Sequence, residues 1–351
     1  MYARTDKPVI LKSWHKLILV SLLWWACNSK NKGPVHAFYH WKTTFTLGPS
    51  DYQKLDSMEV SRLYVRYFDI DKYGDKLKPL GVIEWKSLPA SKLDIVPCVF
   101  ITNRALQFIP DTAIQSLALH VYSKIQKLNA QLNRPVKEIQ MDCDWSPETK
   151  SKYFSFLETL KVLCRQENWL LSATIRLHQI KFPQTTGIPP VDRGMLMYYN
   201  MGDLKSPNET NSILNLETAA QYTSKLPEYP LELDLALPLF SWVVQFRNDE
   251  LLALRSAWNK EDLQNDTLFV HQQKNWYQAR TNGLFKGEYI LKNDRFRVEE
   301  IQPDLVKQAI NHLYSLWKTN PVNLSLFHYN PYEIETYSCR NIEEIYRAAS
   351  Q

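Results

Sequence analysis

Glycine is scarce in this chain, with 9 residues among 351. The sequence contains neither G-x-G-x-x-G nor G-x-x-x-x-G-K-[ST], so the two common glycine-rich phosphate-binding loops are excluded. The 8 histidines form no H-E-x-x-H motif and no closely spaced pair suited to zinc. We therefore expect no cofactor and no zinc centre.

Cysteine is also sparse, and no two of the 5 cysteines have C-x-x-C spacing. A domain of this size does not depend on disulfide bonds for its stability. We interpret four of the cysteines as buried thiols, namely Cys98, Cys143, Cys164 and Cys339. The fifth, Cys27, belongs to a different kind of segment.

No apolar run is long enough to cross a bilayer, which takes about 20 residues. The run from Leu17 to Ala26 follows a basic segment that ends at Lys16, which predicts a signal peptide over 1–26. Cys27 directly after Ala26 resembles the lipidation site of bacterial lipoproteins, with 27–34 as a tether. This resemblance implies a lipid anchor on Cys27 in the cell envelope. An ordinary secretory signal with an incidental cysteine is the alternative.

The predicted mature chain has little net charge. The formal charge is +5, of which the predicted signal peptide carries +3 through Arg4, Lys7, Lys12, Lys16 and Asp6. The remaining +2 is too small to indicate a nucleic-acid partner. We therefore expect no nucleic acid among the ligands.

The rest of the chain alternates apolar runs with helical patterns. Helical spacing is clearest in the segment from Ile114 to Leu132, where apolar residues recur every three or four positions. Eight candidate strands are at 35–41, 62–70, 94–102, 137–144, 169–177, 195–200, 231–240 and 322–329. Strands and helices in this order predict an α/β fold, a (β/α)8 TIM barrel over 35–351. An irregular stretch at about 246–301, with a short helix at about 250–258, predicts an insertion after the seventh strand.

The fourth candidate strand has one apolar and one polar face. Because side chains alternate along a strand, Gln140, Asp142 and Asp144 point one way while Ile139 and its alternating partners point the other. Polar residues at the end of a barrel strand indicate an active site. The Cα atoms of Asp142 and Asp144 would lie about 6.5 Å apart, and the repulsion between their carboxylates would raise one pKa, as a general acid requires. A solvated pair, or a salt bridge to Arg66 or Arg176, is the alternative.

This stretch resembles a known motif. Gln140-Met141-Asp142-Cys143-Asp144-Trp145 is similar to the fourth-strand motif D-x-x-D-x-D-x-E of family 18 glycoside hydrolases, the chitinases. Tyr198-Tyr199-Asn200 resembles the aromatic motif on the sixth strand of that family. The chain also resembles bacterial lipoproteins with a glycosidase-like TIM barrel. These resemblances imply a carbohydrate substrate or ligand.

The motif departs from the family at one decisive position. Aligned on Trp145, Ser146 occupies the place of the catalytic Glu, and a serine cannot protonate a glycosidic oxygen. Glu148 is better suited to the first helical turn, where it faces the helix dipole. The protein therefore uses a different carboxylate, or it is not an enzyme of the chitinase type.

We predict Asp144 as proton donor, Asp142 as its orienting neighbour and Asp234 as the carboxylate across the barrel. Asp69, Asp71 and Glu232 are further candidate acids. Aromatic and charged side chains near strand ends would bind the sugar by stacking and hydrogen bonding. They are Trp41, Arg66, Asp69, Trp145, Arg176, Tyr198, Tyr199, Trp242 and Tyr329.

The leading hypothesis is an envelope lipoprotein that hydrolyses a poly- or oligosaccharide by carboxylate acid/base catalysis. The alternative, favoured by Ser146, is a surface lipoprotein that binds a glycan without catalysis. A hydrolase with a divalent cation held by Asp142, Asp144 and Asp234 is a third, less favoured possibility.

Overall fold

The computed structural model describes residues 1–3, 33–132, 134–317 and 321–350. The chain divides into two compact units, Met1–Gly33 and Pro34–Gln351, and the second contains the fold. The predicted signal peptide, most of the tether and the predicted lipidation site Cys27 lie outside the described residues. Within the described ranges, none of the helices has both the length and the apolar character that crossing a bilayer requires.

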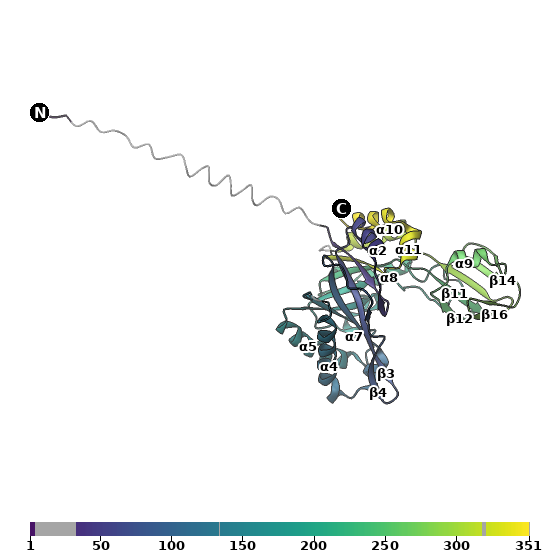
Figure 1. Ribbon diagram of the computed structural model, residues 1–351, viewed down its shortest axis with the longest axis horizontal. Helices are drawn as coiled ribbons and strands as arrows, with labels where there is room; N and C mark the ends of the chain where they lie inside the picture. Colours follow the sequence, from purple (N-terminus) through teal and green to yellow (C-terminus); the bar gives the residue numbers. More distant parts are fainter. Residues whose placement is uncertain (4–32, 133, 318–320, 351) are drawn as a thin grey trace. The chain divides into compact units, whose positions relative to one another are not determined.

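The second unit is built on a closed barrel of parallel strands. The two end strands of the parallel series, β1 and β3, also pair with each other, which closes the ring. The predicted (β/α)8 barrel is therefore confirmed (Figure 1). In order around the ring the strands are β1 (Val35–His40), β3 (Arg62–Tyr73), β6 (Asp94–Ile101), β7 (Glu138–Asp142), β8 (Leu170–Arg176), β9 (Arg193–Met197), β10 (Leu233–Pro238) and β18 (Asn323–Phe327).

Helices follow most of these strands, as the apolar periodicity predicts. Helix α4 buries Ile114, Leu117, Ala118, Val121 and Ile125 on one face. The helices are α2 (Pro49–Ser57), α3 (Asn103–Phe108), η1 (Asp111–Ala113), α4 (Ile114–Asn129), α5 (Lys150–Gln166), α6 (Leu177–Lys181), α7 (Pro183–Thr186), α8 (Leu216–Thr223), η2 (Leu226–Glu228), α10 (Pro303–Leu316), α11 (Pro331–Tyr337) and α12 (Cys339–Ala348).

After β3 the chain forms a hairpin in place of a helix. Strand β4 (Lys76–Leu80) pairs antiparallel with the end of β3, and a positive φ at Gly74 makes the tight turn. The short strands β2 (Thr44–Phe45) and β5 (Glu84–Trp85) pair nearby. This hairpin accounts for part of the stretch 72–93, which the sequence pattern alone leaves unassigned.

The insertion after the seventh barrel strand forms a five-stranded antiparallel sheet in the order β12-β11-β17-β14-β13. It has its own apolar cluster around Trp258, Phe269 and Phe296. A helix expected at 250–258 is instead strand β12, because those residues pair with β11. The elements are β11 (Trp242–Arg247), β12 (Glu250–Arg255), α9 (Lys260–Asn265), β13 (Phe269–His271), β14 (Trp276–Ala279), β15 (Gly283–Phe285), β16 (Glu288–Ile290) and β17 (Arg295–Glu299).

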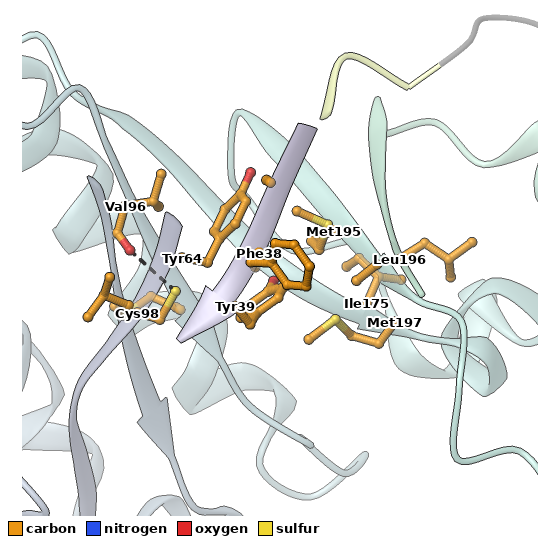
Figure 2. Close-up of a cluster of buried hydrophobic side chains, with 14 of the residues drawn as sticks. Phe38, Tyr39, Tyr64, Val96, Cys98, Ile175, Met195, Leu196 and Met197 are labelled. Atoms are coloured by element: carbon orange, nitrogen blue, oxygen red, sulfur yellow. Dashed lines mark hydrogen bonds between the residues drawn. The ribbon is translucent and has the colours of Figure 1, made fainter. Parts of the chain in front are cut away.

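Aromatic and sulfur-containing side chains fill the barrel interior. Figure 2 shows Tyr39 and Tyr64 beside Cys98, with Met195 and Met197 near them. The rings of Tyr39 and Tyr64 stack with centroids 4.9 Å apart. The hydroxyl of Tyr39 donates to Oε1 of Gln140 at 2.6 Å, so a polar group deep in the barrel is satisfied. The interior of the barrel is packed with side chains, so a ligand can approach it only from the two ends of the barrel.

Candidate functional site

The two aspartates of the central motif lie at the carboxyl-terminal end of β7 and share one cation, Arg176. The Nε of Arg176 is 2.5 Å from Oδ1 of Asp144, and an Nη of Arg176 is 3.4 Å from Oδ1 of Asp142. Asp142 also accepts a hydrogen bond of 2.6 Å from Oγ1 of Thr174. Strand pairing explains the geometry, because β7 and β8 run parallel with Met141 opposite Ala173. The sequence left open a solvated pair or a salt bridge to Arg66 or Arg176, and the structure has the salt bridge to Arg176.

The two carboxylates differ in their access to solvent. The side chain of Asp142 is 7% exposed, whereas that of Asp144 is 56% exposed. Burial raises the pKa of Asp142, and the nearby Arg176 opposes this rise. Burial disfavours the charge on Arg176, but Asp142 and Asp144 together raise its pKa. The result is a fixed guanidinium between a buried and an exposed carboxylate.

Asp144 and Arg176 form part of the wall of a cavity of about 340 Å³, which we call the polar cleft. Volumes of this size are typical of small-ligand pockets. Its walls come from the ends of β8 and β9, from α6 and from α8. The lining residues are Asp144, Arg176, Leu177, His178, Tyr199, Asn200, Met201 and Tyr222. The sequence motifs do not point to Leu177 or Tyr222, because neither belongs to a motif and Tyr222 comes from a helix.

A row of touching aromatic rings adjoins the polar cleft through Tyr199. Ring centroids are 5.7 Å apart for Trp41 and Phe327, 5.2 Å for Phe327 and Tyr199, and 5.9 Å for Tyr199 and Phe240. Phe240 then contacts Trp242 at 5.2 Å. We call these five residues the aromatic row. Three of the predicted aromatic residues are brought together here, and Phe240 and Phe327 were missed because isolated phenylalanines at strand ends resemble ordinary core.

Arg66 and Asp69, both predicted to bind substrate, lie at the same end of the barrel. The Nε of Arg66 donates to Oδ1 of Asp69 at 2.8 Å, so the two charges satisfy each other. The Arg66 guanidinium also lies over the ring of Trp41, 6.0 Å from its centroid. This pair extends the polar surface from the aromatic row toward β3.

Three predicted aromatic residues are directed elsewhere. Trp145 is 3% exposed and its Nε1 donates to the carbonyl of Thr186 at 2.9 Å. Tyr198 is fully buried because it alternates with Tyr199 along the strand direction. Tyr329 is 1% exposed, and its hydroxyl donates to Oδ1 of Asp51 at 2.8 Å. They belong to the packing around the barrel and do not line the polar cleft.

Asp234, the predicted partner across the barrel, lies at the opposite end. It is the second residue of β10, and its carboxylate accepts hydrogen bonds from Asn323 Nδ2 at 2.5 Å and Arg193 at 3.0 Å. Glu138, the first residue of β7, lies in the same polar layer through Arg62 and Asn323. The pairing of Asp144 with Asp234 is therefore wrong, because Asp234 begins its strand whereas Asp144 follows the end of another.

The same placement removes the basis for a cation held by Asp142, Asp144 and Asp234. In the described ranges, no group of three or more His, Cys, Asp or Glu side chains has the geometry of a metal site. At the position of the chitinase acid, the backbone N–H of Ser146 donates to Oγ1 of Thr149 at 2.9 Å. A hydrogen bond from Ser146 also lowers the pKa of the exposed Glu148. Neither residue lines the polar cleft.

The insertion supports the loop that forms one wall of the polar cleft. Glu299 on β17 is fully buried, and its Oε2 accepts hydrogen bonds from the Ser212 N–H at 2.8 Å and from Trp242 Nε1 at 2.9 Å. The carbonyl of Ser212 accepts in turn from the N–H of Met201 at 3.1 Å. One carboxylate thus fixes both a wall residue and a member of the aromatic row.

Neither a protein-family model nor a curated protein matches this chain. Solved structures do resemble it. The group IV chitinase of Ostrinia furnacalis superposes with a TM-score of 0.55 at 12% identity, covering 90% of this chain and 99% of the chitinase. The spore cortex-lytic enzyme SleL of Bacillus cereus gives 0.53 at 13% identity, covering 91% of this chain and 75% of the enzyme.

The GH18 chitinase ChiB from the chitin utilization locus of Flavobacterium johnsoniae gives a TM-score of 0.52 at 13% identity, covering 90% of this chain and 94% of ChiB. At these identities the likeness concerns the fold. The sequence motif and the superpositions agree on one architecture. This chain therefore has a glycoside-hydrolase-like barrel, similar in fold to family 18 chitinases.

Proposed function

We propose that this protein binds a carbohydrate in the polar cleft and along the aromatic row, without acid/base turnover. One observation supports this above the others: Asp144 is the only carboxylate among the described residues that line the polar cleft, and it is paired with Arg176. A hydrolase of the usual kind needs an acid and a second carboxylate on either side of the bond. The polar cleft offers one carboxylate, which forms an ion pair with a neighbouring cation.

The chemistry of the walls fits a sugar. Asp144 accepts hydrogen bonds from hydroxyl groups, Arg176 donates, and Asn200 does both. The partly buried Trp41 and Trp242 offer flat apolar surface to a sugar ring. A sugar ring has apolar faces and a hydroxylated edge. It therefore requires aromatic side chains beside a polar wall.

Hydrolysis is the second candidate, and two observations favour it. The neighbours in fold are named as chitinases and a cortex-lytic enzyme. In addition, burial raises the pKa of Asp142, as a proton donor near neutral pH requires. Substrate-assisted enzymes need only one acid, so Asp142 or Asp144 would serve in that role.

A panel of soluble glycans decides between the two. Chitin oligosaccharides and peptidoglycan fragments come first, because the enzymes with a similar fold include a chitinase from a chitin utilization locus and a spore cortex-lytic enzyme. Binding is measured by calorimetry and turnover by the release of new reducing ends. We expect binding without turnover, and we expect Trp41→Ala to weaken it at least about tenfold, a loss typical of a removed stacking ring.

Turnover of any glycan would favour the second candidate, in which case Asp144→Asn should reduce it by about 100-fold or more if Asp144 is the acid. Unchanged turnover in Asp144→Asn would leave Asp142→Asn as the next variant. If no glycan binds or reacts, the carbohydrate proposal is wrong. Val162→Ala, an exposed residue on α5 outside the polar cleft, serves as the matched control.

We further propose that Cys27 carries a lipid that holds the protein in the cell envelope. The support is the sequence order of a basic segment, an apolar run and a cysteine. In cells, Cys27→Ala should move the protein from the membrane fraction to the soluble fraction. Retention of that variant in the membrane fraction would contradict the lipid anchor.

A further inference from the structure

An apolar groove of about 530 Å³ lies on the outer side of the barrel, between the β3–β4 hairpin and the segment from α3 to α4. Figure 1 shows the hairpin beside α4. The groove is independent of the polar cleft, since no residue lines both. The floor is made of Phe68, Ile70, Leu77, Ile109, Leu117 and Val121. Phe68 and Val121 are almost fully buried, so this floor is recessed below the surface.

The rim of the groove is cationic. Lys76, Lys78 and Lys124 line it, against one carboxylate, Asp75. The ammonium of Lys124 lies 5.7 Å from the ring centroid of Phe68, and that of Lys78 lies 4.6 Å from Tyr73. Within the described part of the chain, none of these three lysines has a carboxylate oxygen within 4.0 Å. Unpaired cations around an apolar hollow complement a ligand that is apolar with an anionic end.

We propose that this lysine-rimmed groove binds the acyl chain of a long-chain amphiphile whose anionic head lies among Lys76, Lys78 and Lys124. The volume falls in the range of small-molecule sites, and the lining is mostly apolar with a few charged groups at the edge, as such sites are. The proposal is independent of the carbohydrate function.

Two other occupants fit less well. A peptide that adds a strand to β4 would need free backbone N–H groups along that edge, but Pro79 has none, and Lys76 and Lys78 discourage strand pairing. A bilayer surface is bound by a layer of protruding apolar side chains, whereas the lining of this groove has one large exposed apolar residue, Phe108, above a recessed floor. A single flexible chain can enter the groove where a sheet or a bilayer cannot.

The test uses the purified full chain with a dansyl-labelled undecanoate as the probe, and the uncharged methyl ester of the same probe as comparison. We expect the carboxylate to bind with micromolar affinity and at least about tenfold more tightly than the ester, because only the carboxylate meets the lysines. Raising the salt concentration should weaken binding of the carboxylate and leave the ester unchanged.

Two variants locate the site. Lys78→Glu combined with Lys124→Glu should weaken binding of the carboxylate probe at least about tenfold. The matched control, Lys127→Glu with Lys292→Glu, reverses two exposed lysines outside the groove and should leave binding unchanged. Ala113→Trp should fill the partly exposed edge of the groove and abolish binding of both probes; Ser116→Trp replaces it if the first variant fails to fold.

The proposal is overturned if the probe does not bind, if the two charge-reversal pairs weaken binding equally, or if neither tryptophan variant affects binding. Sedimentation with anionic vesicles, without binding of the monomeric probe, would also overturn it and would indicate a membrane surface instead. Loss of glycan binding is not expected in any of these variants, so the two proposals fail or succeed separately.

Discussion

Arg176 is the side chain on which the electrostatics of the polar cleft depend. Asp142 is buried, and Arg176 is the cation beside it. Removing one partner of a buried ion pair leaves the other charge without compensation. The same guanidinium also orients the exposed Asp144 toward the polar cleft. We therefore expect both the stability of the fold and its ligand binding to depend on this one residue.

Arg176→Met should lower the free energy of unfolding by roughly 2–4 kcal/mol at neutral pH, and it should abolish glycan binding. Because burial raises the pKa of Asp142, acidification neutralises this carboxyl before an ordinary aspartate, so the loss of stability should shrink as the pH falls. Urea unfolding at several pH values measures both effects. Arg104→Met is the control: Arg104 pairs with Asp71 at the surface, and its loss should cost less than about 1 kcal/mol. Equal losses in the two variants would contradict this account.

Two histidines at neighbouring strand ends predict a pH dependence of stability. Burial lowers the pKa of His40 and of His328 to about 4, and the charge on Lys42 adds to the effect in both. In the unfolded chain a histidine has a pKa near 6.5. Below pH 6.5 the unfolded state therefore takes up protons that the folded state does not, and stability is lost as the pH falls from about 6.5 to 4.

Each histidine should account for up to about 3 kcal/mol of this loss, from 1.36 kcal/mol per unit of pKa difference. His40→Asn should flatten the curve of unfolding free energy between pH 6.5 and 4 by that amount. His120→Asn, at an exposed position, should leave the curve unchanged. A curve for His40→Asn that parallels the unsubstituted protein would show that His40 takes up its proton equally in the folded and unfolded states, and would contradict the lowered pKa.

Among the secondary structure elements, β17 connects the insertion to the polar cleft and the aromatic row. Its buried Glu299 accepts hydrogen bonds from Ser212 and Trp242, and Arg297 beside it donates to the carbonyl of Ser206 at 2.6 Å. The loop between β9 and α8 is therefore held by a strand that lies far along the sequence. Its wall residues, Asn200 and Met201, depend on this support.

Glu299→Gln should remove the charge that pairs with the buried Arg297, weaken the hydrogen bonds to Ser212 and Trp242, and lower the free energy of unfolding by about 3–5 kcal/mol. Hydrogen exchange over 200–212 should become faster, the fluorescence of Trp242 should shift to the red, and glycan binding should weaken. Glu300→Gln is the matched control, because the side chain of the neighbouring Glu300 pairs with Lys260, at 3.7 Å, and the backbone carbonyl that accepts from Asn211 is unchanged by the substitution. Unchanged exchange over 200–212 in Glu299→Gln would mean that the loop is held by other contacts.

Considered as a whole, the second unit has two apolar cores. The larger fills and surrounds the barrel, and the smaller, around Phe296, lies in the insertion. Phe296 is fully buried and packs against Trp258 and Phe269, with centroids 6.0 Å and 5.1 Å apart. Separate cores often open as separate cooperative units.

Phe296→Ala should cost about 3–5 kcal/mol in the insertion. Hydrogen exchange should rise throughout 242–299 and remain slow in α4 and α5 of the barrel. Phe156→Ala, the counterpart on α5, should have the opposite pattern, because Phe156 is buried in the barrel core. A uniform rise in exchange in both variants would show that the two cores unfold together.

Much of the barrel could be predicted from the sequence, because its evidence is local. The period of the apolar residues distinguishes α4 from β7, and both elements are found where that period indicates. The alternation that separates Asp142 from Cys143 likewise follows from the geometry of a strand. The motif and this alternation were sufficient to find Asp142, Asp144 and Tyr199.

Only the tertiary structure decided which of these side chains meet. Asp234, like Asp142, is an aspartate on a strand of the barrel, but it lies at the start of its strand. Sequence alternation does not tell the two ends of a barrel apart. Similarly, nothing local indicates that Glu299 holds Ser212, and the sequence left open whether the two aspartates pair with Arg66 or with Arg176. The sequence by itself determined the elements and their faces, since these follow from neighbouring residues. The contacts in the polar cleft and the aromatic row depend on strand order and register, which join residues that are distant along the chain.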